Sequence, residues 1–149
     1  MPKVLIVYGS TTGMTELVAF EVEKTLKSEG LEVEIKNVIE ANATELFNCE
    51  NLLFGVSTWD FGCLQYDFEP FHEELKNIEL SRKCFAVFGT GDKAYGDTYC
   101  EAVRIVEKTC LEKGWTEILP RMEVECDLTE ARLEQVRKWS GELARKLKI

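Results

Sequence analysis

Short apolar runs alternate with segments of helical periodicity along the whole chain, and this alternation constrains the fold more than any other feature. The runs are brief and contain many β-branched residues, which is typical of strands buried on both faces of a parallel sheet. They lie at 4–8, 33–38, 52–56, 84–88 and 115–119, with a short continuation of the last around 122–124.

Between these runs, apolar residues recur at the three- and four-residue spacing of an amphipathic helix. The helical segments cover 14–26, 68–78, 99–110 and 133–147, and the connection 40–48 has room for a short helix. Gly30 and Gly114 are expected C-terminal caps, and Thr129 is the expected N-cap of the last helix. The pattern predicts an α/β fold, a doubly wound parallel sheet with helices on both faces.

The length and charge of the chain narrow the class of protein. A chain of 149 residues suits a single domain over 1–149. Its net charge of −9 argues against nucleic acid or an anionic membrane and favours partners with basic docking surfaces. Residues 40–80 hold nine acids and one base. A solvated surface that only aids solubility is the plain alternative for this stretch.

The cysteines and the N-terminus indicate a cytoplasmic protein. None of the six cysteines forms a C-x-x-C pair, so buried free thiols are expected rather than disulfides or a metal site. The first apolar run is too short for a signal peptide or a membrane span. His72, between acids on a predicted helix, is expected to be exposed and to bind no metal. Trp115 and Trp139 are expected to pack in or beside the core.

The loops after the first, third and fourth strands contain the unusual residues, and in such a sheet ligands bind at the carboxyl ends of the strands. Loop one, Ser10–Thr15, places four hydroxyls and a glycine at a helix N-terminus, which favours an anion. It matches neither the P-loop nor the dinucleotide-binding motif. Because it lacks Lys and Arg, it suits a phosphomonoester that is held and not transferred. A capping turn rich in Ser and Thr is the structural alternative.

Aromatic residues mark the other two loops. Trp59 lies in loop three, 57–63, and Tyr95 and Tyr99 lie in loop four, 90–100. A planar ligand would cover such aromatic side chains by stacking. Tyr95 is the candidate for the second face of the ring, whereas Tyr99 is better placed for packing. An anion site and a slot for a flat ring on one sheet edge indicate a cofactor that resembles a mononucleotide.

Three motifs resemble those of the flavodoxin family. They are VLIVYGSTTGMT at 4–15, GVSTW at 55–59 and FGTGDKAY at 88–95, and they fall in the family's order and spacing over the whole chain. The resemblance implies the short-chain form of that fold, a five-stranded sheet in the order 2-1-3-4-5. It also implies a monomeric, low-potential carrier that holds FMN without covalent attachment and passes single electrons between redox proteins.

The resemblance assigns cofactor-binding roles to residues of all three loops. Trp59 and Tyr95 would cover the two ring faces, Asp92 would accept from the ring N3–H, and the backbone around Cys100 would meet the pyrimidine carbonyl. The implied phosphate-binding residues are Ser10, Thr11, Thr12, Gly13, Met14, Thr15 and Ser57. The implied residues around the ring are Thr58, Trp59, Asp60, Phe61, Gly62, Gly91, Asp92, Tyr95, Tyr99 and Cys100.

Two positions depart from the family's usual residues. Met14 stands where Asn is usual, and Asp60 stands where Gly usually lets the peptide reorient as the flavin is reduced. The alternatives are a flavin enzyme on the same fold (a quinone reductase or a ribonucleotide-reductase-activating flavoprotein) and a receiver-type signalling domain. The enzyme would need room beside the ring, and the receiver domain would need an acidic pair where this chain has Gly9 and Ser10.

Overall fold

The computed structural model describes residues 3–10, 13–59, 63–80 and 82–147. Within these ranges the side chains of six residues lie outside the description, namely those of Trp59, Cys63, Leu64, Tyr95, Asp97 and Thr98.

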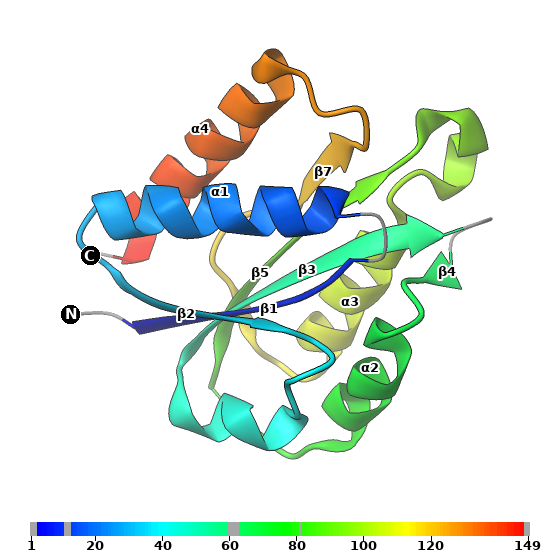
Figure 1. Cartoon of the computed structure of the whole chain (residues 1–149). Helices are drawn as coiled ribbons and strands as arrows, with labels where there is room; N and C mark the ends of the chain where they lie inside the picture. The colour runs from blue at the N-terminus through cyan, green and yellow to red at the C-terminus, as the bar shows by residue number, and fades with distance from the viewer. Residues whose placement is uncertain (1–2, 11–12, 60–62, 81, 148–149) are drawn as a thin grey trace.

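A parallel sheet forms the middle layer of the molecule (Figure 1). Its strands run in the order β2-β1-β3-β5-β6, which confirms the predicted 2-1-3-4-5 order. The predicted fifth strand is broken in two, because β6 pairs with the first residues of β5 and β7 pairs with its last. The bounds are β1 Lys3–Gly9, β2 Glu32–Asn37, β3 Asn51–Trp59, β5 Cys84–Gly91, β6 Thr116–Glu117 and β7 Met122–Glu125.

Helices cover both faces of this sheet, as predicted. In Figure 1, α1 (Met14–Ser28) and α4 (Glu130–Leu147) lie side by side on one face. The other face carries η1 (Ala43–Asn48), α2 (Phe68–Asn77) and α3 (Glu101–Glu112). The two layers of helices give the molecule two hydrophobic cores, one on each side of the sheet.

Strand β1 shows how the sequence supplies both cores. Successive side chains of a strand point to opposite faces of the sheet. Val4 and Ile6 therefore join the core under α1 and α4, and Leu5 and Val7 join the core under α2 and α3. Because both faces are covered, the strand has to be apolar at every position, and this requirement is the origin of the unbroken run in the sequence.

Local signals account for several element boundaries. Asn42 begins η1 with a capping box that includes Glu45. The Thr129 hydroxyl accepts a bond of 3.2 Å from the Arg132 N–H, which confirms the predicted cap of α4. Helix α3 begins at Glu101, so the prediction that it starts at Tyr99 placed its start two residues too early. Strand β4 (Cys63–Leu64) was not predicted, because two residues carry no periodic signal.

The cysteines and tryptophans fit their predictions in part. Cys49, Cys100 and Cys110 are buried free thiols, whereas Cys84 and Cys126 are only half-buried. Two tryptophans pack as predicted and donate their indole N–H groups to backbone carbonyls. Trp115 donates to the Leu80 carbonyl at 2.8 Å, and Trp139 donates to the Pro120 carbonyl at 2.9 Å.

The prediction that His72 is exposed is wrong. Its side chain is buried between α2 and α3, and its Nε2 lies 2.8 Å from the Thr109 hydroxyl. Its acidic neighbours in sequence suggested a solvated face, but the helical repeat turns His72 towards α3 together with Phe68 and Leu75. Burial lowers the pKa of His72 below its usual value, because the buried ring lacks the water that would solvate its positive charge.

We expect His72 to make the fold sensitive to acid. As the pH falls through about 6.5, His72 takes up a proton in the unfolded chain before it does so in the folded chain. The folded state therefore loses stability on acidification. His72→Gln should remove this loss, and urea unfolding between about pH 8 and pH 5 measures it. Equal pH slopes in the two proteins would contradict this expectation, and the comparison is direct because the chain has one histidine.

Glu117 has the opposite dependence on pH. Burial and the neighbouring Glu107 carboxylate raise the pKa of Glu117 to about 7, and its Oε2 is buried with no hydrogen-bond partner in the described part of the chain. The folded state therefore favours the protonated acid. The stability that this proton contributes is complete below the ordinary pKa of a glutamic acid and is lost as the pH rises through about 7.

Glu117→Gln is therefore expected to stabilise the protein at about pH 8 and to leave it unchanged near pH 4. The amide resembles the protonated acid and carries no charge to desolvate. Glu112→Gln, on the exposed end of α3, is the matched control and should change little at either pH. Thermal unfolding at the two pH values measures the difference. A stabilisation that is the same at both would show that charge on Glu117 is not its cause.

Candidate functional site

Three strands of the sheet end together at one edge, beside the N-terminus of α1 (Figure 1). The register pairs Gly9 of β1 with Val56 of β3, and Ser57 of β3 with Thr90 of β5. Since parallel strands share a direction, the three predicted loops leave the sheet at this edge. The structure thus brings together the described parts of loops one, three and four, as the sequence predicted.

A cluster of buried hydroxyls joins these strand ends. The Thr15 hydroxyl lies 2.7 Å from that of Ser57 and 2.7 Å from that of Thr90. Thr15 belongs to the first turn of α1, and the other two residues belong to β3 and β5. All three are buried. The cluster therefore fixes the start of α1 over the ends of both strands. Thr15 and Ser57, two of the implied phosphate-binding residues, thus lie together, and their contact with a phosphate stays a prediction.

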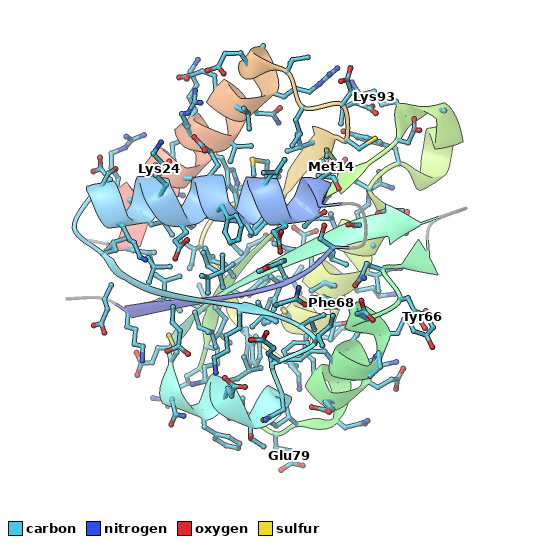
Figure 2. The ribbon with its side chains drawn as sticks, viewed as in Figure 1. Met14, Lys24, Tyr66, Phe68, Glu79 and Lys93 are labelled. Carbon is cyan, nitrogen blue, oxygen red and sulfur yellow. The ribbon has the colours of Figure 1, made fainter. Side chains whose placement is uncertain are left out.

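The N-terminus of α1 lies beside the hydroxyl cluster and begins at a glycine. Gly13 is its N-cap with a φ of 91°, and no side chain accepts a bond from the first turn among the described residues. The Gly13 N–H itself donates to the Ser10 hydroxyl at 3.1 Å. Free N–H groups and the helix dipole favour negative charge here. Met14 follows at the start of the helix (Figure 2). Thr11 and Thr12 lie outside the described residues.

An acid also stands in this first turn of α1. Glu16 accepts a hydrogen bond of 2.7 Å from the Tyr8 hydroxyl. Burial, and after it the bond to Glu16, raises the pKa of Tyr8 to about 12. The carboxylate is thus held by Tyr8 on the side of β1, and the tyrosine keeps its proton across the physiological range.

Loop three is tied down on two sides. The Thr58 hydroxyl accepts a bond of 3.0 Å from the Ala102 N–H at the start of α3. Thr58 and Trp59 also pair with β4 in an antiparallel ladder. The backbone at the predicted ring-binding position is therefore ordered by both neighbours. The roles of Asp60, Phe61 and Gly62 lie outside the described residues, as does the side chain of Trp59.

Loop four contains a second helical turn, η2 (Lys93–Thr98). Asp92 is its N-cap, and the Asp92 Oδ1 accepts from the Ala94 N–H at 2.9 Å. A Cβ at Gly91 would lie 2.7 Å from the backbone nitrogen of Cys100, so only glycine permits this close approach. Asp92 is exposed, and its predicted bond to a ring N–H stays a prediction. The side chain of Tyr95 is outside the description.

Tyr99 and Cys100 connect loop four to α3. Tyr99 packs against the core under α2 and α3, and the Lys93 ammonium lies 5.8 Å from its ring centroid. Its role in packing is confirmed, and its predicted contact with a ligand remains untested. Cys100 is buried with a φ of 53°. Burial raises the pKa of the Cys100 thiol to about 12 and of the Tyr99 hydroxyl as well, so both stay protonated.

Sequence reasoning missed three residues that hold these loops in place. Thr90 completes the hydroxyl cluster, and its position directly before Gly91 at a strand end was the available signal. Arg104 donates to the Tyr99 carbonyl at 2.6 Å and to Glu101 at 2.8 Å. Buried Gln65 donates its backbone N–H to the Ser57 carbonyl at 3.1 Å. Only tertiary contacts reveal the last two.

Comparison with known proteins agrees with this geometry. The family model described as Flavodoxin matches residues 6–139. The chain is 35% identical to a flavodoxin of Maridesulfovibrio salexigens over 150 residues, which span 99% of this chain and 100% of the relative. It is 31% identical to probable flavodoxin 2 of Bacillus subtilis, over 98% of this chain and 97% of the relative.

A solved structure, oxidised flavodoxin 2 from Bacillus cereus, superposes with a TM-score of 0.91 and 34% identity, over 97% of this chain and 99% of that one. The chain belongs to the flavodoxin family. Flavodoxins transfer electrons, so this chain is an electron-transfer protein rather than an enzyme. Nothing in the comparisons favours the quinone reductase or the ribonucleotide-reductase activator, and the receiver domain is excluded by the family match.

Two further findings concern membranes and metals. Among the described residues, the helices are all too short or too polar to cross a bilayer. The same part of the chain contains no group of three His, Cys, Asp or Glu residues placed to hold a metal ion.

Thr90→Val tests the hydroxyl cluster. Valine has the same shape but cannot bond to Thr15, so the free energy of unfolding should fall by about 1 kcal/mol. Thr90→Ser keeps the hydroxyl and is the matched control; it should retain the bond to Thr15. Urea unfolding of both variants without flavin measures the difference. If serine and valine cost the same, the hydroxyl is not what holds α1 to β5.

Proposed function

We propose that this flavodoxin holds one FMN at the shared edge of β1, β3 and β5 and passes single electrons at low potential between redox proteins. The observation that carries the proposal is the N-terminus of α1, which has no side-chain cap among the residues that the structure describes and is fixed by the Thr15 cluster. A terminal phosphate would complete it, with Ser10 and the first-turn N–H groups as donors.

The residues present fit this group. The donors at the start of α1 are neutral, so they suit a phosphate that stays bound and is not transferred. Glycine at position 91 brings the backbone of loop four against Cys100, and Thr58 ties loop three to α3. The backbones of both loops are thereby held at the same edge. Trp59 and Tyr95 are proposed to cover the two faces of the flavin, where stacking would shield it from water.

When bound, FMN would supply the electron-accepting ring, and the chain would bind, orient and tune it. Of the acids in residues 40–80, Glu69, Glu73 and Glu74 lie on α2 and Asp67 is its N-cap, and the segment before α2 is bonded to the end of β3 at this edge. Negative side chains near the ring disfavour the added negative charge of reduction and so lower its potential. The same charge would attract a basic partner and would be screened by salt. We propose further that the protein acts as a cytoplasmic monomer.

The experiment for this proposal compares FMN with riboflavin, which lacks the phosphate. The apoprotein should bind FMN much more tightly, because only FMN satisfies the first turn of α1. Quenching of flavin fluorescence measures both affinities. Equal affinities would remove the phosphate site from the proposal.

Thr15→Val should reduce the difference in affinity between FMN and riboflavin, because it loosens the turn that would bind the phosphate. Thr25→Val, later on the same helix, is the matched control and should leave this difference unchanged. If neither variant changed this difference in affinity, Thr15 would not position the phosphate-binding turn.

A further inference from the structure

A groove of about 740 Å³ lies outside the strand-end site, between the β2–η1 connection and α2. We call it the α2 groove. One wall is formed by Val38, Ile39 and Ala41, and the other is formed by the start of α2 with the residues before it, 66–74. Neither the hydroxyl cluster nor the N-terminus of α1 contributes to it. The side chains that line the groove therefore need a separate explanation.

Two large apolar side chains at this groove are exposed to solvent. Tyr66 is 81% exposed and Ile39 is 68% exposed. Figure 2 shows Tyr66 projecting away from the body of the protein, whereas Phe68, the first residue of α2, is buried in the core. Isolated exposed apolar residues need no explanation, but these two face one groove from opposite walls.

The charge of the groove has a single sign. Asp67, Glu69, Glu73 and Glu74 all line it, and no Lys or Arg lines it among the described residues, although Glu73 is paired with Lys76 of the same helix at 2.7 Å. His72 also lines it, and burial keeps the pKa of this ring low, so it adds no positive charge. Apolar surface framed by acids selects an occupant with the reverse arrangement, an apolar side chain between basic residues.

Both walls are attached to the strands that lead to the flavin edge. The Val38 N–H donates to the Tyr8 carbonyl of β1 at 2.7 Å. On the other wall, the Gln65 N–H donates to the Ser57 carbonyl of β3 at 3.1 Å, and Tyr66 follows directly. An occupant of the α2 groove would therefore sit beside the site where the strand ends meet, and not at the opposite end of the sheet.

We propose that the α2 groove is the docking site for a redox partner protein, which inserts an apolar side chain between Ile39 and Tyr66 and places basic residues against the acids of α2. This inference rests on the proposed function, since it names how the partner is recognised. The acids alone would attract any basic surface, and the apolar pair adds a defined position and orientation. A second copy of this chain is a poor occupant, because its net charge of −9 opposes association.

The test measures electron transfer from the reduced holoprotein to a basic c-type cytochrome by stopped flow, over a range of cytochrome concentrations. The double variant Ile39→Ser with Tyr66→Ser should weaken apparent binding about ten-fold, the loss expected when one large apolar side chain is no longer buried. The control pair is Phe47→Ser with Leu111→Ser, two other exposed apolar residues, and it should change binding little.

A second comparison separates local charge from net charge. Glu69→Gln with Glu73→Gln should weaken binding and reduce its salt dependence more than Glu112→Gln with Glu142→Gln, which changes the net charge equally on α3 and α4. Equal effects of groove and control pairs, in either comparison, would overturn the proposal. So would a groove-dependent dimer in sedimentation, which would assign the groove to a second copy.

Failure of the proposed function can be told apart from failure of this inference. The flavin spectrum and FMN affinity of each variant are measured first, and the groove variants should retain both. NMR titration of the unreduced protein with the cytochrome then reports binding without electron transfer. Shifts centred on residues 38–41 and 66–74 would support the groove even if the transfer rate were low, and shifts elsewhere would overturn it.

Discussion

The hydroxyl of Thr15 is hydrogen bonded at once to residues of two different strands, and the geometry of the site depends on this junction. Ser57 lies at the end of β3 and Thr90 lies at the end of β5, so one side chain from α1 fixes the helix against both. Because the three groups are buried, losing either bond would cost free energy that water could not restore. The helix N-terminus is therefore held in place before any ligand arrives.

Loop four is supported by a network of ion pairs and hydrogen bonds. Arg104 of α3 binds the Tyr99 carbonyl and reaches Glu123 on β7 at 3.1 Å, and Arg121 binds the same carboxylate at 2.7 Å. Arg121 continues to Glu107 at 2.8 Å. These partly exposed pairs contribute little stability one by one, but together they join α3, β7 and the loop before α3. The loop backbone is thus supported from the side away from the strand ends.

The two faces of the sheet differ in what they offer to other molecules. The face with α1 and α4 carries ion pairs such as Arg137 with Glu21 and Glu130, and α2 carries one between Lys76 and Glu73. The face with α2 presents acids together with exposed Ile39 and Tyr66. These acids and the two apolar residues line the α2 groove, which lies between the β2–η1 connection and α2. Recognition and cofactor chemistry can therefore occupy neighbouring but separate surfaces.

The order of the strands was implied by the resemblance to flavodoxins, whereas the sequence by itself determined, through its hydrophobic pattern, the strands, the helices on both faces and the three loops at one edge, because strands buried on both sides must be apolar throughout and helices must repeat with their turn. It also determined which residues of loop one meet the helix N-terminus. Only the tertiary structure decided that His72 is buried, that Gln65 and Arg104 support the loops, and that β4 exists. The burial of His72 depends on its contact with Thr109, 37 residues further along the chain, and the other features depend on the folding of the turns beside Ser57 and Tyr99, which no local period or propensity encodes.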